Sequence, residues 1–396
     1  MFELLNQPGT DAIVHLMLQA QADTRAEVCD LTVGIYRDES GAIPMMEAVR
    51  KADMELAQTR PDKGYVGPLG DQEYVQAIKN LALPGGFHGH TVEGAQTPGG
   101  SSALRLALDV IKMARPDARV WVSDPGYTNH APTAIAAGLE LCYYPFFDAR
   151  SGASRKKEFI SLLSTLGEKD VIVFHGCCHN PTGLKITNDE WQQIAMLAKL
   201  QKFFPLLDTA YQGLGEGVVA DAYGADCLLQ NVDELALTYS CSKNFGLYSD
   251  RVGAVLFAGR DGGAVKKAQA QIAPAARPTY WVPPNNGAQI VKKILGSDEL
   301  KALWENELTA MRNRINSIRA ALLESLKQVS GSDRYDFLAQ QSGMFSMFPA
   351  TEAQMTQLRE DYAIYGLPDG RLNVSGMKMS KVNYIAQSLH AVLSPD

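Results

Sequence analysis

The segment around Lys243 has the strongest potential for chemistry. Residues 239–246 read Tyr-Ser-Cys-Ser-Lys-Asn-Phe-Gly and follow a short apolar run. A partly buried lysine has a lowered ammonium pKa, and its neutral amine attacks carbonyl carbons. A lone lysine is nevertheless more often a solvated surface charge. Ser240 and Lys243 also match the S-x-x-K pattern of serine acyl-enzymes, although the K-T-G segment expected with it does not occur.

A glycine-rich turn provides a candidate anion site. Residues 97–102 read Thr-Pro-Gly-Gly-Ser-Ser and lead into a helical pattern at 102–114. Free backbone N–H groups at a helix start bind anions, and two serine hydroxyls add donors. The spacing matches neither the Walker A nor the G-x-G-x-x-G pattern. A serine-capped turn without a ligand explains the same residues.

Residues 175–183 read His-Gly-Cys-Cys-His-Asn-Pro-Thr-Gly and again follow an apolar run. His175, Cys177 and His179 alternate along the chain, so in an extended segment they share one face and could hold a metal. Structural zinc takes four ligands, and no second cluster supplies the others. Asn-Pro and Thr-Gly are also common turn pairs, which favours a strand-to-loop turn.

Four further charged residues stand at chemically useful positions. Asp208 ends an apolar run, where a carboxylate is unfavourable without a cationic partner, so it is either a helix cap or the partner of a buried ring nitrogen. Arg251, Arg277 and Arg371 are singly more typical of a surface. Guanidinium groups bind carboxylates and phosphates in a fork, so together these arginines would suit an anionic cofactor and a dicarboxylate substrate.

Alternating strands and helices are predicted to position these residues. Short apolar runs predict buried strands at 118–122, 141–147, 171–174, 203–207, 235–239 and 252–257. Helical patterns fall between them at 102–114, 132–138, 157–166 and 189–201. This order predicts an α/β fold with a largely parallel sheet that is covered on both faces. Ligands of such sheets bind beyond the carboxyl ends of the strands, where the motifs above lie.

A different pattern follows residue 284. A long amphipathic helix is predicted at about 298–328, and residues 335–396 suggest a small α+β unit that ends in a helix at 381–393. The first forty residues are expected to pack with this unit. Because 396 residues exceed one hydrophobic core, we predict a large domain at 44–310 and a small domain formed by 1–43 and 311–396.

Composition excludes several classes of protein. The formal net charge of -7 and the absence of a basic run denser than Arg155-Lys156-Lys157 argue against a nucleic-acid partner. No apolar stretch reaches transmembrane length, and residues 1–9 lack the features of a signal peptide. The six cysteines suggest free thiols in a reducing compartment, so we predict a cytoplasmic protein without a membrane partner.

Taken in order, the motifs resemble the aspartate and aromatic-amino-acid (tyrosine) branch of the class I aminotransferases, over essentially the whole chain. The matching segments are His179-Asn180-Pro-Thr-Gly, Asp208-x-x-Tyr211-Gln-Gly, Ser240-x-Ser-Lys243-Asn-Phe-Gly-Leu-Tyr-x-x-Arg251-Val-Gly and Gly-Arg371-Leu-Asn-Val-Ser-Gly. The resemblance implies a fold-type I transferase dependent on pyridoxal 5'-phosphate (PLP). It also implies a mostly parallel seven-stranded sheet and a homodimer with shared active sites.

The resemblance implies catalytic roles for residues in these motifs. Lys243 would hold PLP as a Schiff base and move the proton at the substrate Cα. Asp208 would keep the pyridine nitrogen protonated, with His130 and His179 supporting it from behind. Tyr211 and Asn180 would hydrogen-bond the ring oxygen, and Tyr127 would stack on the ring. The latter position is usually tryptophan in aspartate aminotransferases.

Further residues would bind the anionic groups. Gly100, Ser101, Ser240 and Arg251 would bind the cofactor phosphate, with Tyr65 of the partner subunit. Ser101 stands where threonine is common, and Ser102 replaces a usual glycine.

The substrate would be held at both ends. Arg371, with Gly34 and Asn180, would bind the substrate α-carboxylate. Arg277 of the partner subunit would bind a distal carboxylate.

Four residues make the expected pocket more apolar than in a strict aspartate enzyme: Trp281 and Val282, which replace small polar residues, and Ile35 and Ile43 at the pocket mouth. Each apolar contact would favour an aromatic side chain by about 1 kcal/mol. We therefore predict amino transfer from tyrosine or phenylalanine, and also from aspartate, to 2-oxoglutarate through a ping-pong cycle. The alternative is an aspartate aminotransferase with narrow dicarboxylate specificity. A serine acyltransferase, a PLP lyase and a non-catalytic protein of this fold are rival classes.

Overall fold

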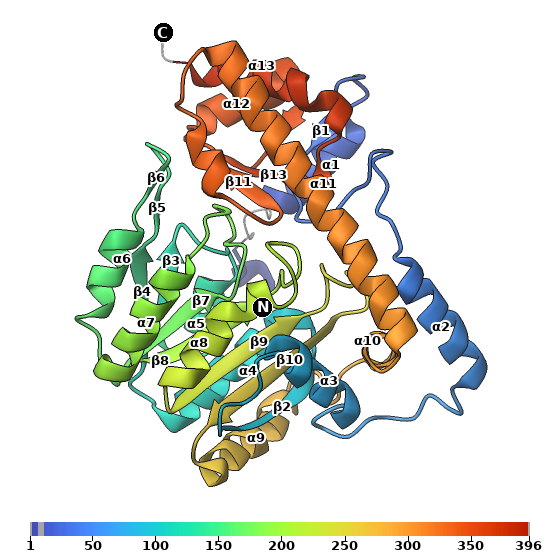
Figure 1. Ribbon diagram of the computed structural model, residues 1–396, viewed down its shortest axis with the longest axis vertical. Helices are drawn as coiled ribbons and strands as arrows, with labels where there is room; N and C mark the ends of the chain where they lie inside the picture. The colour runs from blue at the N-terminus through green and yellow to red at the C-terminus, as the bar shows by residue number, and fades with distance from the viewer. Residues whose placement is uncertain (1, 7–11, 395–396) are drawn as a thin grey trace.

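The computed structural model describes residues 2–6 and 12–394 (Figure 1). At its centre lies a seven-stranded sheet, in the order β2 (Thr91–Pro98), β10 (Val252–Gly259), β9 (Glu234–Ser240), β8 (Phe204–Thr209), β7 (Asp170–His175), β3 (Arg119–Asp124) and β4 (Glu140–Pro145). Only β10 runs antiparallel to its neighbours. The predicted α/β fold with a mostly parallel seven-stranded sheet is confirmed. The interpretation of residues 1–9 lies partly outside the described residues.

Each predicted strand is present, and the structure adds β2 at the edge of the sheet. This strand was missed because its sequence, TVEGAQTP, contains polar residues and only two aliphatic side chains. Its pairing with β10 depends on close backbone approach. A Cβ atom at Gly94 would lie 2.2 Å from the Val255 carbonyl oxygen. Tertiary pairing therefore decides this strand, and the local apolar pattern does not.

Helices cover both faces of the sheet, as predicted. Residues of α4 (Gly99–Ala114), α5 (His130–Ala136) and α9 (Gly262–Ala276) share one apolar core with one side of the strands. The opposite core includes residues of α6 (Lys156–Leu163), α7 (Asn188–Gln201) and α8 (Tyr223–Asn231). Alternate residues of each strand enter the two cores: Ile172 and Phe174 enter one, Val171 and Val173 the other.

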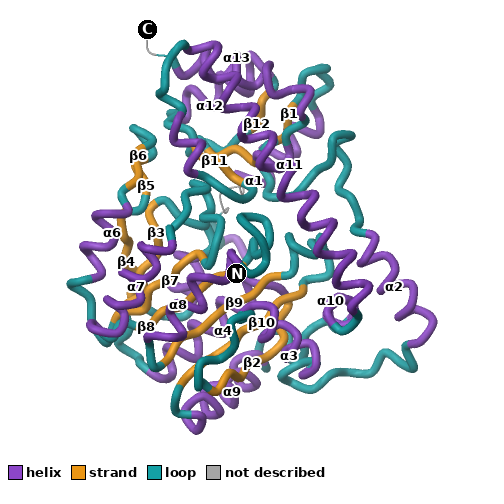
Figure 2. Tube along the Cα trace, in the orientation of Figure 1, coloured by secondary structure: helices purple, strands orange, loops and turns teal. Residues whose placement is uncertain are grey.

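A smaller unit lies above the sheet in Figure 1 and is separate from it in the tube view of Figure 2. It contains the two-stranded sheets β1 (Cys29–Asp30) with β12 (Ile364–Tyr365) and β11 (Phe345–Met347) with β13 (Arg371–Asn373). The pairing of β1 with β12 confirms that the N-terminal residues pack with the C-terminal unit. The predicted domain boundary at residue 310 falls inside α11 (Asp298–Ser330), which continues through it. The division into domains stays a prediction.

The remaining elements are short or peripheral. They are α1 (Ala12–Ala22), α2 (Glu47–Thr59), α3 (Gln72–Ala82), α10 (Asn286–Leu295), α12 (Glu352–Tyr362), α13 (Val382–Leu393), β5 (Phe147–Asp148), β6 (Ala153–Ser154) and the 3-10 helices η1 (Phe2–Leu4), η2 (Ala220–Ala222), η3 (Asp336–Gln340), η4 (Val374–Gly376) and η5 (Met379–Lys381).

The long helix α11 fixes the backbone next to Lys243. Trp304 of α11 is fully buried, and its indole N–H donates to the Asn244 carbonyl oxygen at 2.7 Å. Its ring also stacks on Phe245, with 4.6 Å between ring centroids. Since a carbonyl that loses its donor in the interior stays unsatisfied, this contact holds the turn that follows β9.

Trp304→Phe is predicted to lower the free energy of unfolding by about 1–2 kcal/mol, because it keeps an aromatic ring but removes the donor to the Asn244 carbonyl. Urea titration followed by circular dichroism measures this change. Tyr143→Phe is the control, because it removes a hydroxyl from a ring that is 54% exposed. Equal stability of the two variants would contradict this role of Trp304.

Candidate active site

A cavity at the carboxyl ends of β7, β8 and β9 contains most of the predicted site residues. Those that line it are Gly34, Gly100, Ser101, Tyr127, Asn180, Asp208, Tyr211, Ser240, Lys243 and Arg251. Ile35 lines it as well, as predicted for the pocket mouth. Sequence reasoning missed Val33, Leu104, Ala210, Ser242 and Tyr248 as lining residues, and assigned His175 only to the metal alternative. Among these residues, Tyr248 could have been found from the sequence, because it belongs to the motif Asn-Phe-Gly-Leu-Tyr.

Asp208 lies near the end of β8, and its carboxylate is kept anionic by neighbours. His130 Nε2 lies 2.9 Å from Asp208 Oδ2, and the Thr238 hydroxyl donates to Oδ1 at 2.6 Å. Burial alone would raise the pKa of Asp208. The imidazole of His130 and the hydroxyl of Thr238 outweigh burial, so the pKa lies below its ordinary value. The site therefore presents a negative charge on the floor of the cavity.

Three histidines form a row behind this carboxylate. The ring centroids of His130 and His175 are 4.9 Å apart, and those of His175 and His179 are 4.1 Å apart. His179 also contacts the Ser123 hydroxyl at 3.0 Å. Burial lowers the pKa of His175 and His179 far below the ordinary value, so both rings are neutral at neutral pH. His175 thus packs against His130, and His179 packs against His175, without adding a charge near Asp208.

Lys243 reaches the cavity from the turn after β9. Its Nζ lies 5.1 Å from the centroid of the Tyr211 ring, and within the described part of the chain it forms no hydrogen bond or ion pair. Burial lowers the pKa of Lys243 to about 8. The charge of Asp208 opposes this shift and that of Arg251 supports it. At pH 7 about a tenth of the amine is thus neutral and nucleophilic, far more than in an ordinary lysine.

An anion cradle is formed where α4 begins. Gly100, Ser101, Ser240 and Arg251 all line the cavity there, and Arg251 has no carboxylate partner among residues 2–6 and 12–394. Close approach requires glycine. A Cβ atom at Gly99, whose φ is +80°, would lie 2.6 Å from Arg251 Nη2. The N–H groups at the start of α4, the serine hydroxyls and the guanidinium together suit a phosphate.

Arg371 lies beneath the other end of the cavity and is 4% exposed. Its guanidinium donates to the Asn180 side-chain oxygen at 3.3 Å and to the Thr32 carbonyl at 3.0 Å, and it lies over the Phe345 ring. Asn180 in turn donates to the Tyr211 hydroxyl at 3.2 Å. Arg371 does not line the cavity directly. It contacts Asn180, which in turn contacts Tyr211, and the resemblance implies a role in the site for both of these residues.

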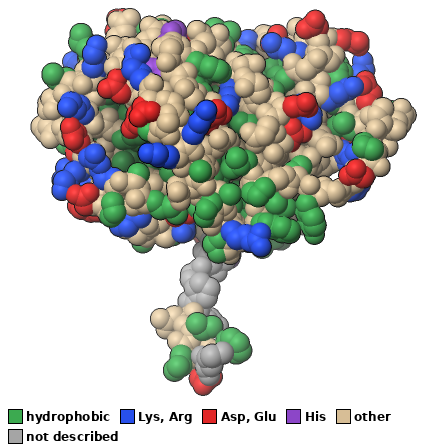
Figure 3. Space-filling model, turned by 90° about the horizontal axis from the view of Figure 1, so that it is seen from below, with side chains coloured by type: hydrophobic (Ala, Val, Ile, Leu, Met, Phe, Trp, Pro, Cys, Tyr) green, Lys and Arg blue, Asp and Glu red, His purple; other side chains and the backbone are tan. Residues whose placement is uncertain are grey.

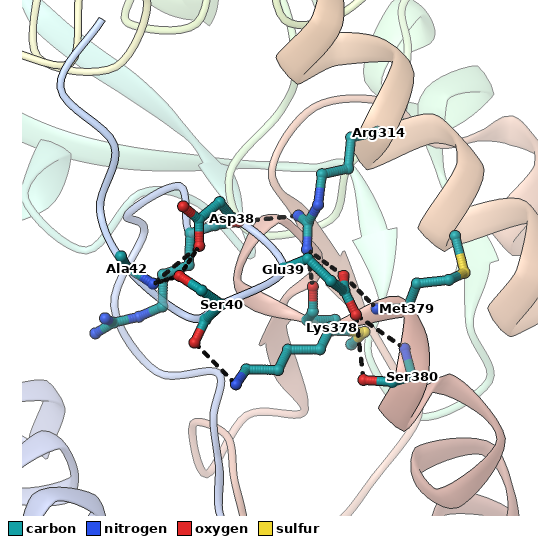
Figure 4. A network of polar contacts seen from close by, with 10 residues as sticks. Asp38, Glu39, Ser40, Ala42, Arg314, Lys378, Met379 and Ser380 are labelled. Atoms are coloured by element: carbon teal, nitrogen blue, oxygen red, sulfur yellow. Dashed lines mark hydrogen bonds and ion pairs between the residues drawn. The ribbon is translucent and has the colours of Figure 1, made fainter.

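A polar network holds the segment that carries Gly34 and Ile35 (Figure 4). Arg314 of α11 donates to the carbonyls of Arg37 and Met377 at 2.9 and 2.8 Å and pairs with Glu39. Glu39 also accepts from the N–H groups of Met379 and Ser380. These bonds outweigh the effect of burial and lower the pKa of Glu39 to about 2. The cavity wall is thereby fastened to both α11 and the C-terminal unit.

Besides Arg371, five residues predicted for the pocket do not line this cavity: Tyr65, Arg277, Ile43, Trp281 and Val282. Tyr65 is 83% exposed, and its ring lies 5.2 Å from that of Trp281. The Arg277 guanidinium lies over the Trp281 ring, 5.0 Å from its centroid. Ile43 is 47% exposed, and neither it, Trp281 nor Val282 lines the cavity of its own chain. All five residues were expected near the pocket, and Tyr65 and Arg277 were expected to reach it from a partner subunit.

The metal hypothesis for His175, Cys177 and His179 is not supported by the arrangement of the described residues. The metal-competent group that the structure brings together there is Cys177, Cys178 and Asp221, within 4.8 Å of one another. The two histidines belong to the row behind Asp208. The positive φ of Cys178, 51°, breaks the alternation along an extended segment on which the hypothesis depended.

Comparison with known proteins agrees with this geometry. Residues 26–389 match the family model of the class I and II aminotransferases. An aromatic-amino-acid aminotransferase from Paracoccus denitrificans is 37% identical over 97% of this chain and 98% of its own length. An aspartate aminotransferase from Salmonella typhi is 38% identical over 99% and 100%. The crystal structure of an aromatic-amino-acid aminotransferase from Burkholderia pseudomallei, covalently bound to pyridoxal phosphate, superposes with a TM-score of 0.94 at 33% identity, with 100% of both chains covered.

The chain therefore belongs to the class I and II aminotransferases. It is a PLP-dependent transaminase that acts on amino acids and oxo acids. The residues present fit the cofactor, because the cavity combines a phosphate cradle, an anionic carboxylate for a cationic ring nitrogen and an unpartnered amine that can hold an aldehyde carbon. The serine acyltransferase alternative is thereby excluded. No helix among the described residues is both long and apolar enough to cross a membrane.

The lowered pKa of Lys243 predicts how cofactor capture depends on pH. Only the neutral amine attacks an aldehyde, so the capture rate of the apoenzyme should rise about tenfold per pH unit below 7 and level off above about 8. Stopped-flow absorbance after mixing with PLP measures this rate. A rate that keeps rising to pH 10 would show an ordinary lysine pKa. Lys202→Ala, which removes an exposed lysine, should leave the profile unchanged.

Proposed function

We propose that this enzyme transfers amino groups from aromatic amino acids to 2-oxoglutarate and also accepts aspartate. The observation that carries the proposal is the group formed by Tyr65, Trp281 and Arg277. Arg277 rests on the indole of Trp281, which packs against Tyr65. This group offers an apolar aromatic surface for a substrate ring and a guanidinium for a distal carboxylate. Such a pair of features suits both kinds of substrate.

The residues of the cavity divide the work of the reaction. PLP supplies an electron sink for the electron pair released at the substrate Cα. The Lys243 amine would hold the cofactor covalently and then carry the proton to and from Cα. Asp208 would stabilise a protonated ring nitrogen through its negative charge. Arg371, held by Asn180 and the Thr32 carbonyl, would fix the substrate α-carboxylate.

Tyr127 and Ile35 favour an aromatic substrate within the cavity itself. Both line it, together with the apolar residues Val33 and Leu104. Burial raises the pKa of the Tyr127 phenol, so this ring stays neutral. It therefore offers no charge that could bind the second carboxylate of a dicarboxylate substrate. The relative from Salmonella typhi acts on aspartate by name, and the narrow dicarboxylate specificity remains the second candidate. The retention of Arg277 is the observation that favours it.

We further propose a homodimer with shared active sites in the cytoplasm. Tyr65 and Arg277 are exposed and do not line the active-site cavity of their own chain, which a second copy would explain. Phe2, Leu4 and Leu5 are 71–82% exposed, and the face of the molecule seen in Figure 3 carries hydrophobic side chains. Apolar groups in this arrangement suit a self-complementary contact. The six free thiols fit a reducing compartment.

The half-reactions of the PLP-loaded enzyme with tyrosine and with aspartate test the substrate proposal. We expect the second-order rate constant for tyrosine to equal or exceed that for aspartate, read from the loss of the cofactor's visible absorbance. An aspartate advantage of a hundredfold, about 2.7 kcal/mol, would replace the proposal by the narrow alternative. Lys243→Ala is the control and should abolish turnover with both substrates.

Mixing two inactive variants tests the shared active site. Lys243→Ala lacks the amine and Arg277→Leu lacks the distal guanidinium, but a hybrid dimer contains one intact site if Arg277 acts across the interface. Re-formed from equal amounts, the mixture should recover about a quarter of wild-type turnover of aspartate with 2-oxoglutarate. Recovery should fail if each chain supplies its own Arg277. Analytical ultracentrifugation of the mixture verifies that dimers have re-formed.

A further inference from the structure

A second cavity, separate from the active site, lies between α11, the residues around η3 and the loop at 215–216. It is formed by one face of the helix, where Arg312, Asn316, Arg319 and Leu323 follow one another at helical spacing. None of the residues predicted for the active site lines it. Neither the proposed reaction nor the proposed dimer gives it a role.

The polar end of this cavity is strongly cationic. Lys185, Arg312 and Arg319 line it, opposed by the single carboxylate of Glu216. Glu216 is already paired with Lys185 at 2.6 Å. Arg312 donates to the Gly213 carbonyl and lies near the Thr309 hydroxyl. Neither it nor Arg319 pairs with a carboxylate anywhere in residues 2–6 and 12–394. Two positive charges therefore face the cavity without compensation.

Arg319 is the most unusual of these residues, because it is 4% exposed. It donates to the carbonyls of Gly343 and Phe345 and lies 3.4 Å from the Ser346 hydroxyl. Its Nη1 atom and both amide atoms of Gln341 are buried and have no hydrogen-bond partner among the described residues. Burial lowers the pKa of Arg319 to about 10, so it stays charged at neutral pH. An uncompensated charge in a low-dielectric wall attracts an anion strongly.

The remaining lining residues indicate which kind of anion would bind in this cavity. Ser342 offers a hydroxyl that makes no hydrogen bond to another described residue, next to the cationic end. Ala320, Leu323, Leu338 and Ala339 form an apolar end. From these features we propose that the cavity is a binding site for a small carboxylate with an apolar body. The carboxylate would lie between Arg312 and Ser342, and the apolar body would cover the leucines.

The site lies one layer behind the substrate arginine. Arg319 holds the Phe345 carbonyl at 3.2 Å, while the Phe345 ring supports Arg371 at 4.8 Å. The Ser342 N–H donates to the Gly183 carbonyl at 2.7 Å, in the turn that carries Asn180. The segment 342–345 thus connects the second cavity to Arg371 and to the turn that carries Asn180. The proposal concerns binding at the second cavity and does not rest on the substrate assignment.

Isothermal titration of the PLP-loaded enzyme with phenylacetate tests the proposal. Arg312→Gln removes the accessible guanidinium, and Asn316→Asp adds a negative charge at an exposed position of the same helix face. Each should weaken binding at this site at least tenfold. Lys301→Gln is the matched control, since it removes an exposed charge elsewhere on α11 and should change nothing. Both test positions reach the surface, so folding is expected to survive, and circular dichroism verifies it.

Arg371→Lys separates this site from the active site, where phenylacetate can also bind. Binding that persists in Arg371→Lys but is lost in Arg312→Gln and Asn316→Asp supports the second site. Binding lost only in Arg371→Lys, or absent from the wild type, would overturn it. Acetate should bind at least tenfold more weakly than phenylacetate, and equal affinity would disprove the role of the apolar end.

Discussion

Asp208 places a negative charge at the end of β8, where its side chain is 11% exposed and lines the active-site cavity. Such a charge is tolerated because His130 and Thr238 bind it from within the protein. His175 and His179 behind it can stay neutral because both are buried. The open side of the carboxylate then faces a cavity that also holds Lys243. The position of this anion decides where a cationic ring can bind.

The sheet brings groups from distant parts of the sequence to this anion. Parallel strands end at one edge, so residues that follow β3, β7, β8 and β9 meet there although more than a hundred residues separate the first from the last. Close packing keeps them in place. Gly99 and Gly34 each allow a neighbour, Arg251 and Phe345, to approach where a Cβ atom would clash. The phosphate cradle and the cavity wall depend on these approaches.

The helix α11 connects the two ends of the molecule. Near its start, Trp304 holds the turn after Lys243, and further along Arg314 fastens the segment that carries Gly34. Arg319 supports the strand beneath Arg371. One rigid element therefore positions the cofactor lysine, the cavity wall and the substrate arginine together. This explains why so long a helix carries both buried aromatic and buried charged residues.

The motifs around Lys243, Asp208 and Asn180 and the strands that precede them were determined by the sequence alone, because short apolar runs and turn residues act locally. Tertiary structure decided the rest. The edge strand β2 forms through pairing with β10, and the contact of Tyr65 with Trp281 joins rings from two separate loops. The cationic cavity behind Phe345 unites α11 with Lys185, which lies over a hundred positions earlier in the chain. Such contacts depend on how the chain closes on itself, which no local pattern encodes.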